Sequence, residues 1–276
     1  MDKTSLGDRM KAYEKAYARK AMPLLPVIAR LDGKAFHTWC KDLDKPFDED
    51  FMRIMQETTK ELMHLSNPVI GYTQSDEITL IFYSPDPESQ IFFDGKIEKM
   101  TSVLASMCTA AFKLSLDRHI QKFWSTAKGK LLFSKPPALF DCRVFQVPTL
   151  EEAANCLIWR ELDATRNSIL SVAQSKFSHK EMQNKNTSEL QEMMFQKDGT
   201  NWGEDFTPPQ KRGSYYKQVI SKRRFTTEEI NKLPPKHEAR TNPKLEVERT
   251  EIKRMVFKPL TKMNERVFNL FKNEVY

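Results

Sequence analysis

Three acidic residues in this sequence occupy positions suited to binding a hard cation. Asp76 and Glu77 stand in a short polar junction between two apolar runs, at 68–72 and 78–83, and Asp32 ends a third apolar run. Carboxylates at strand ends suit Mg²⁺, which one or two of them hold together with the phosphate oxygens of a substrate. Each position alone is also typical of an ordinary solvated turn. The metal-binding prediction therefore depends on a fold that brings them together.

Apolar periodicity predicts the elements of that fold. Period-two spacing of β-branched and aromatic residues is typical of strands, and apolar residues at helical spacing are typical of helices that cover a sheet. Thr149 and Glu152 have the spacing of a capping box, at which a helix would begin. The predicted strands are 24–31, 68–72, 78–83 and 139–147, and the predicted helices are 4–20, 48–65, 95–124 and 149–173.

The order strand, helix, hairpin, helix, strand predicts the α+β class, with a ferredoxin-like βαββαβ sheet and its helices on one face. The end of the first strand would then lie beside the central hairpin, and Asp32 and Asp76 would form one metal site. Because side chains alternate along a strand, Asp76 and Glu77 are not both expected to be direct ligands. Glu77 either accepts hydrogen bonds behind the site or faces the other way.

Composition limits the class of protein. A chain of 276 residues with 39% apolar and 29% charged residues is typical of a globular protein with one large or two modest domains. It contains no apolar run of the roughly 18 residues that a membrane span needs, and no hydrophobic signal region at its N-terminus. We therefore expect a cytoplasmic protein without a membrane partner. Its scattered cysteines predict reduced thiols rather than a zinc site or disulfides, and they are Cys40, Cys108, Cys142 and Cys156.

The excess positive charge is confined to the C-terminal part. Residues 1–196 hold 26 basic and 26 acidic residues, whereas residues 197–276 hold 18 basic and 11 acidic ones. Aromatic and basic residues alternate over 214–225, a pattern that suits stacking on bases and pairing with phosphates. The same pattern suits an exposed β-hairpin, and a basic surface can also be simply solvated. The sequence thus predicts a body at 1–185 and a basic region at 186–276.

Two of these motifs together resemble the tRNA-His guanylyltransferase family. They are Arg-Leu-Asp-Gly-Lys-Ala-Phe-His at 30–37 and Gly-Tyr-Thr-Gln-Ser-Asp-Glu at 71–77, and the resemblance extends over roughly residues 5–215. Eukaryotic members carry His-Ile-Asn-Asn where this chain has Thr-Arg-Asn-Ser at 165–168, so only Asn167 matches. This departure resembles the guanylyltransferase-like proteins of bacteria and archaea.

The resemblance implies template-dependent addition of nucleotides to the 5′ end of tRNA, in the 3′-to-5′ direction, by a palm domain like that of ordinary polymerases. The 3′-hydroxyl of an incoming nucleotide would attack a 5′-triphosphate, or a 5′-monophosphate that ATP or GTP has activated. Guanylate addition to tRNA-His is an alternative, as are a palm-type nucleotide cyclase and a non-catalytic RNA-binding protein. The implied partners are tRNA, nucleoside triphosphates and other copies of the chain in a homotetramer.

The resemblance also implies roles for individual residues. Asp32 and Asp76 would be catalytic and, with the carbonyl of Gly33, would hold two Mg²⁺ ions, with Glu77 behind them. Three basic residues would contact tRNA, and they are Arg166, Lys211 and Arg212. The residues that would contact nucleotides are Arg30, Lys34, Phe36, His37, Lys45, Ser75 and Asn167.

Overall fold

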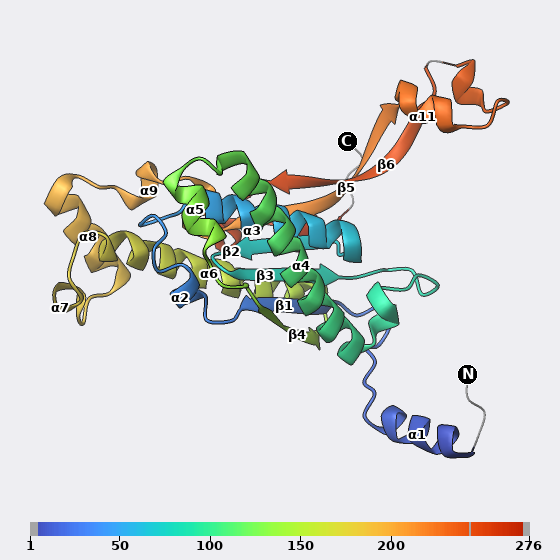
Figure 1. The fold of residues 1–276 in the computed structure, drawn as a ribbon, viewed down its shortest axis with the longest axis horizontal. Coiled ribbons are helices and arrows are strands. Elements are labelled where there is room, and N and C mark those ends of the chain that lie inside the picture. The colour runs from blue at the N-terminus through green and yellow to red at the C-terminus, as the bar shows by residue number, and fades with distance from the viewer. Residues whose placement is uncertain (1–4, 243, 273–276) are drawn as a thin grey trace.

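An antiparallel sheet organises the fold. The computed structural model describes residues 5–242 and 244–272, and six strands of this part of the chain form one sheet in the order β4-β1-β3-β2-β5-β6 (Figure 1). Every neighbouring pair in it is antiparallel. The strands are β1 (Val27–Gly33), β2 (Ile70–Gln74), β3 (Glu77–Phe82), β4 (Phe140–Gln146), β5 (Ser214–Arg224) and β6 (Glu246–Met255).

Helices connect and cover these strands. The long ones are α1 (Ser5–Ala16), α3 (Glu49–Ser66), α4 (Ile97–Phe123), α6 (Leu150–Gln174) and α8 (Thr187–Asp198). The short ones are α2 (Phe36–Trp39), α5 (Ala127–Phe133), α7 (His179–Met182), α9 (Trp202–Asp205), α10 (Pro208–Arg212), α11 (Thr227–Lys232) and α12 (Arg266–Phe271). The described residues also include three 3₁₀ helices, which are η1 (Phe92–Gly95), η2 (Glu238–Arg240) and η3 (Leu260–Lys262).

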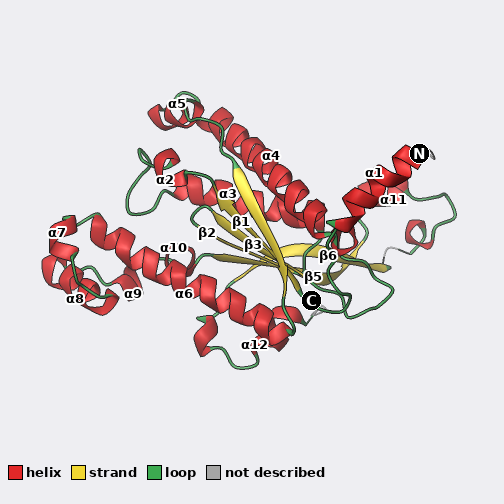
Figure 2. Ribbon diagram, turned by 90° about the horizontal axis from the view of Figure 1, so that it is seen from below, coloured by secondary structure: helices red, strands yellow, loops and turns green. Residues whose placement is uncertain are grey.

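Both faces of the sheet are covered, so the expectation of helices on one face is wrong (Figure 2). Because side chains alternate along a strand, Val27, Ala29 and Leu31 of β1 pack toward α3 and α4. The intervening Ile28 packs in the second apolar cluster with Leu157 of α6 and with the C-terminal elements η3 and α12. Consecutive residues of β1 are apolar over most of the strand, so both of its faces are apolar. The sequence therefore did not indicate that only one face of the sheet would be covered by helices.

The predicted strands and helices over residues 24–173 are all present, with shifted boundaries. The first strand begins at Val27 rather than at position 24, because Leu24 has a left-handed backbone (φ 64°). Asp48 is the N-cap of α3, where its side chain accepts from the backbone of Phe51. Thr149 caps α6 as predicted, but the Glu152 side chain accepts from Asn155 instead of completing a capping box.

The aromatic-basic stretch at 214–225 is largely strand β5. Its first residues pair with β2, from Thr73↔Ser214 to Ile70↔Lys217, and the rest pairs only with β6, as far as Arg224↔Glu246. The result is a two-stranded ribbon that extends away from the body and carries α11 at its tip (Figure 1). α1 also lies apart from the body and has no buried residue.

Two predictions from composition can be compared with the described residues. All four cysteines are free thiols, as expected. No helix within residues 5–242 and 244–272 has the length and apolar character that crossing a bilayer requires.

Candidate active site

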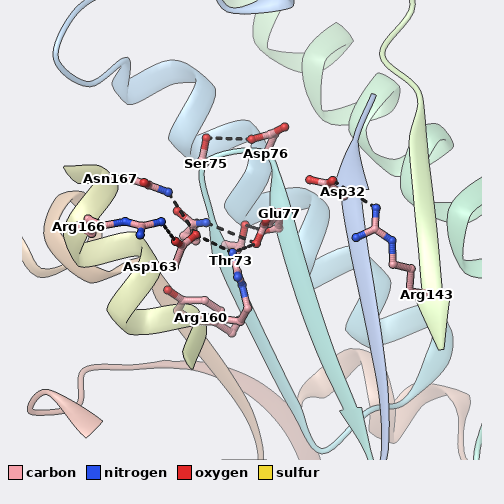
Figure 3. Close-up of polar contacts among 12 residues, drawn as sticks. Asp32, Thr73, Ser75, Asp76, Glu77, Arg143, Arg160, Asp163, Arg166 and Asn167 are labelled. Atoms are coloured by element: carbon pink, nitrogen blue, oxygen red, sulfur yellow. Dashed lines mark hydrogen bonds and ion pairs between the residues drawn. The ribbon is translucent and has the colours of Figure 1, made fainter. Parts of the chain in front are cut away.

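One row across the sheet carries three carboxylates. In the strand register Asp32 of β1 lies opposite Glu77 of β3 on one side and opposite Asp141 of β4 on the other. Directly opposite residues share a face of the sheet, and here it is the face toward α6. Asp76 immediately precedes Glu77, at the same end of the sheet as Asp32 (Figure 3). The fold therefore gathers the acidic residues that the sequence singled out.

A tight turn presents Asp76. Gln74 and Glu77 are the closing pair of the hairpin, which leaves Ser75 and Asp76 as its two turn residues. Ser75 has a left-handed backbone with φ 48°, a conformation that costs a non-glycine residue roughly 1–2 kcal/mol. Its hydroxyl donates to Asp76 Oδ1 at 3.0 Å. The strained turn thus places Asp76 at the tip of the hairpin and orients its carboxylate.

The electrostatic surroundings of Asp76 fit a bound cation. Burial is the largest cause of its raised pKa, and the negative charges of Asp32 and Glu77 raise it further, while the Ser75 hydroxyl opposes the shift. No salt bridge to Asp76 occurs among the described residues. Asp32 has a long ion pair, with Arg143 at 3.8 Å. A divalent cation would relieve this repulsion, and carboxylate oxygens are ligands that Mg²⁺ prefers.

The protein supplies few ligands beyond Asp32 and Asp76, called here the acidic pair. Within the described ranges, no group of three or more His, Cys, Asp or Glu side chains is arranged to hold a metal ion. Such a sparse set fits Mg²⁺, which keeps several waters and takes substrate phosphates as ligands. It does not fit a structural metal site with an all-protein ligand shell.

Close packing between Gly33 and the Phe36 ring explains why position 33 requires glycine. A Cβ built on Gly33 would lie 2.3 Å from the Phe36 ring, so only glycine allows β1 to end against this side chain. Phe36 is 3% exposed and packs on Trp39, Phe51 and two further rings, Phe112 and Phe140. The ring is therefore part of the core, and only the backbone of Phe36 is available to a nucleotide.

Glu77 is held by a charged network on α6. Arg160 Nη2 donates to Glu77 Oε2 and, at 3.0 Å, to Asp163 Oδ2. Asp163 also accepts from Arg166 at 2.7 Å and from Asn167 at 3.2 Å (Figure 3). Glu77 therefore accepts a hydrogen bond behind the acidic pair, one of the two roles left open for it.

Sequence reasoning assigned no role to Arg160 or Asp163. The available signal was their spacing with Arg166 and Asn167, since positions three and four apart share one side of a helix. That spacing is also common on solvated helices, and only the 4% exposure of Arg160 distinguishes this network.

A pocket opens beside the hairpin turn. It encloses about 210 Å³ and is lined by residues of α3, α6 and α10 together with the 43–48 loop, and it includes the predicted nucleotide contacts Lys45, Ser75 and Asn167. Lys128 of α5 fixes the loop that carries Lys45, because its ammonium group lies 2.5 Å from both Asp44 and Asp48.

Cys40 also lines this pocket, but its thiol is not a nucleophile. Burial and then the charge of Asp76 raise its pKa to about 12, so the thiol stays protonated at neutral pH. Reactivity of cysteine requires the thiolate, so Cys40 is not expected to act as a nucleophile in this pocket.

The remaining predicted nucleotide contacts lie outside this pocket. Lys34 and His37 are exposed at the end of β1 and on α2. Arg30 lies on the α6 face of β1, with its guanidinium carbon 5.1 Å from the centroid of the Trp159 ring. It is opposite Arg143 of β4 in the register. The structure thus divides these residues between the pocket, the end of β1 and the face of the sheet.

The three residues predicted to contact tRNA make protein contacts of their own. Arg166 binds Asp163. Lys211 donates to the carbonyl of Gly203, and Arg212 donates to the carbonyl of Phe257 at 3.5 Å. Lys211 and Arg212 are the last two residues of α10, and their role toward RNA stays a prediction.

Known proteins with similar sequences and structures bear on this site. A family model described as "tRNAHis guanylyltransferase" matches residues 7–148. Two solved structures of a bacterial tRNA-His guanylyltransferase-like protein are similar. Its ATP complex has TM-score 0.69 and 38% identity over 77% of this chain and 88% of that one. Its GTP complex has TM-score 0.61 and 36% identity over 78% and 86%.

A curated relative is more distant. The tRNA(His) guanylyltransferase of Schizosaccharomyces pombe is 26% identical over 57% of this chain and 57% of its own length. A mimivirus relative that is 31% identical is matched over 63% of its length, so the chain spans about three fifths of these two proteins. The family model covers half of the chain, and the chain therefore belongs to the tRNA-His guanylyltransferase family, whose named members are nucleotidyltransferases.

Proposed function

We propose that this protein adds nucleotides to the 5′ end of tRNA in the 3′-to-5′ direction, with the opposing base as template. The observation that carries the proposal is the juxtaposition of Asp32 and Asp76 with a pocket containing Lys45, Ser75 and Asn167. Similarity to bacterial guanylyltransferase-like proteins in complex with ATP and with GTP supports a nucleotide in that pocket.

The reaction begins from a 5′-triphosphate, or from a 5′-monophosphate whose oxygen has attacked the α-phosphorus of ATP, so that AMP is transferred to it and pyrophosphate leaves. The 3′-hydroxyl oxygen of the incoming nucleotide attacks the phosphorus at the 5′ end, a new phosphodiester bond forms, and pyrophosphate or AMP leaves. GTP is the alternative activating nucleotide, with GMP as its leaving group.

The position of each residue indicates its role in this reaction. Asp32, Asp76 and the Gly33 carbonyl would hold two Mg²⁺ ions, which when bound activate the hydroxyl and neutralise charge on the leaving group. Lys45 and Ser75 bind phosphate oxygens of the nucleotide in the pocket, and Asn167 orients it. Lys34, His37 and the backbone of Phe36 complete the phosphate contacts at the end of β1, and Arg30 contributes from the α6 face of the sheet. Arg160 neutralises Glu77, so that the remaining negative charge is concentrated on the aspartates.

Further parts of the proposal concern architecture. Residues 1–185 form a palm-like, ferredoxin-like catalytic domain, which the strand order β4-β1-β3-β2 supports. Residues 186–276 supply a basic extension that contacts tRNA through Lys211 and Arg212, and Arg166 of α6 adds a contact from the catalytic domain. The chain assembles as a homotetramer, which sedimentation of the purified protein tests directly.

The decisive experiment uses a tRNA that lacks its first nucleotide and carries a 5′-triphosphate, which bypasses activation. Each labelled nucleotide is supplied separately with Mg²⁺. Incorporation only of the nucleotide complementary to the opposing base is the expected result. Guanylate alone, whatever the opposing base, would indicate tRNA-His maturation instead. Binding of tRNA without incorporation of any nucleotide would overturn the proposal.

Asp32→Ala is the matched variant for this assay. It should abolish Mg²⁺-dependent incorporation while tRNA affinity stays within about twofold, because a carboxylate contributes no attraction for phosphates. Equal loss of binding and incorporation would show that Asp32 supports the fold rather than the chemistry.

A further inference from the structure

Trp159 is a large aromatic side chain that the fold leaves half exposed. Its relative exposure is 50%, although α6 buries neighbouring residues on either side, including Leu157 and Arg160. Two guanidinium groups lie over its ring, with Cζ of Arg160 at 4.6 Å and Cζ of Arg30 at 5.1 Å from the centroid. Such cation–π contacts hold the indole in place, while half of the Trp159 side chain stays exposed.

The fixed indole lies beside the catalytic carboxylates. Arg30, which stacks on it, precedes Asp32 by two residues on the same face of β1, a separation of roughly 7 Å along the strand. Arg160, its other neighbour, donates to Glu77 directly opposite Asp32. Asn167 of the nucleotide pocket lies two helical turns further along α6, about 12 Å away, so Trp159 and the pocket occupy separate places along α6.

The surface around Trp159 has the character of a nucleic-acid site. Opposite Arg30 stands the exposed Arg143, and two residues further along β4 is Phe145, which is 37% exposed. Aromatic rings beside arginines bind single-stranded nucleic acid by stacking and charge.

We propose that Trp159 stacks on the nucleobase of the 5′-terminal nucleotide of the RNA. This inference rests on the proposed function, which places the reacting 5′-phosphate at Asp32 and Asp76. The separation between Asp32 and Arg30 along β1 is about the reach of one nucleotide from its 5′-phosphate to its base. Stacking there fixes the terminal nucleotide while the incoming nucleotide occupies the pocket at Ser75 and Asn167.

The test is a binding cycle with two RNAs and two proteins. The RNAs are a tRNA with a 5′-triphosphate and the same tRNA whose 5′-terminal nucleotide is abasic, and the proteins are the wild type and Trp159→Ala. Stacking contributes ~1–3 kcal/mol per base, so Trp159→Ala should weaken binding of the intact RNA roughly 5- to 150-fold. The affinity for the abasic RNA should differ by less than about twofold between the two proteins, because this RNA has no terminal base to stack on either of them.

Two further variants keep the test independent of folding. Leu162→Ala removes another apolar side chain of α6, which is 54% exposed, and should leave both affinities unchanged. Trp159→Phe keeps an aromatic face and should retain most of the preference for the intact RNA, whereas Trp159→Leu should lose it. If Trp159→Ala weakens both RNAs equally, or weakens neither, the stacking inference is wrong.

The outcomes also separate this inference from the proposed function. A wild-type protein that shows the predicted coupling but incorporates no nucleotide would overturn the function and retain the stacking site. Normal incorporation without coupling would overturn the stacking site alone. An increase in KM for the incoming nucleotide with unchanged RNA affinity would assign Trp159 to the other substrate and likewise overturn the inference.

Discussion

Asp32 lies directly opposite Glu77 across β1 and β3, and the residue before Glu77 is Asp76. Three carboxylates thus converge at one end of the sheet. Arg160 binds Glu77, but the charge on Asp76 has no compensating cation among the described residues. Burial and then the negative charges of Asp32 and Glu77 raise the pKa of Asp76. The fold accepts a local electrostatic cost at the position where a divalent cation would bind.

We therefore expect Asp76→Asn to stabilise the cation-free protein and to abolish nucleotide addition. The amide removes a partly buried charge, and a gain of about 1 kcal/mol would raise Tm by roughly 2–4 °C in a domain of this size. Thermal unfolding with and without Mg²⁺ measures the effect. Asp141→Asn is the matched control, because Asp141 lies opposite Asp32 at the same end of the sheet but is exposed and 3.3 Å from Arg143. An equal gain from both variants would contradict a special role for Asp76.

Cation binding should weaken on acidification at a pH above the ordinary aspartate pKa of 3.8. Mg²⁺ requires the ionised carboxylate, and the folded-state pKa of Asp76 is raised above its unfolded value. The destabilising charge is present above the folded pKa and is lost as pH falls through it, so cation-free stability gains from this group on acidification. The increase in Tm caused by Mg²⁺ is measured from about pH 7 to pH 4. The pH at which half of this increase is lost is the midpoint of the loss of cation binding. A midpoint at or below the ordinary value would contradict this assignment.

Asp163 is expected to position Asn167 without touching a substrate. Its carboxylate is the acceptor shared by Asn167, Arg166 and Arg160. Loss of one such hydrogen bond corresponds to about 0.5–1.5 kcal/mol, so Asp163→Ala should raise KM for the incoming nucleotide about 2- to 12-fold. The kcat should fall less than KM rises.

A double variant separates positioning from a general loss of fold. Asp163→Ala in an Asn167→Ala background should add little, because the group it positions is already absent. Asn155→Ala changes an exposed amide on the same helix and should leave KM unchanged. Full additivity of the two alanine changes would show that Asp163 acts by another route.

The four strands at 24–31, 68–72, 78–83 and 139–147 and the helices between them could be predicted, because β-branched and apolar residues recur there at strand or helix spacing. Strands β5 and β6 were not predicted as members of the sheet. The start of α6 at the Thr149 cap and the hairpin around Asp76 likewise follow from local residue types. What could not be predicted depends on contacts distant in sequence. Arg160 is an ordinary basic residue of a helix until β3 brings Glu77 against it, 83 positions away. Which face α6 would cover was equally undetermined, since β1 is apolar on both sides.

Glu161 is expected to tie the C-terminal segment to the body. It is 4% exposed and accepts from the Tyr215 hydroxyl at 2.9 Å and from the Leu260 backbone at 2.8 Å. Burial raises its pKa, and these two donors oppose the shift. Glu161→Ala leaves both donors unsatisfied, at a cost of about 1–3 kcal/mol for each. Urea unfolding should show this loss, and Glu161→Gln, which keeps an acceptor oxygen, should show a smaller one.

Lys211 and Arg212 should each contribute to the salt dependence of tRNA binding. Neutralising one phosphate contact lowers the slope of log affinity against log salt by about one. Lys211→Gln and Arg212→Gln should therefore each weaken binding at low salt and flatten the slope. Lys130→Gln on α5 serves as the control, since that lysine is exposed and lies outside the residues that line the pocket.

The protein contacts of these two side chains provide the competing explanation. Lys211 binds the Gly203 carbonyl, and the Arg212 backbone carbonyl accepts from Tyr72, so either residue could act only by holding α10 against the pocket. In that case the variants would lower Tm and raise KM for the nucleotide, while the salt slope would stay unchanged. Since Arg212→Gln leaves the backbone carbonyl in place, a flattened slope with unchanged Tm would assign its guanidinium to the RNA.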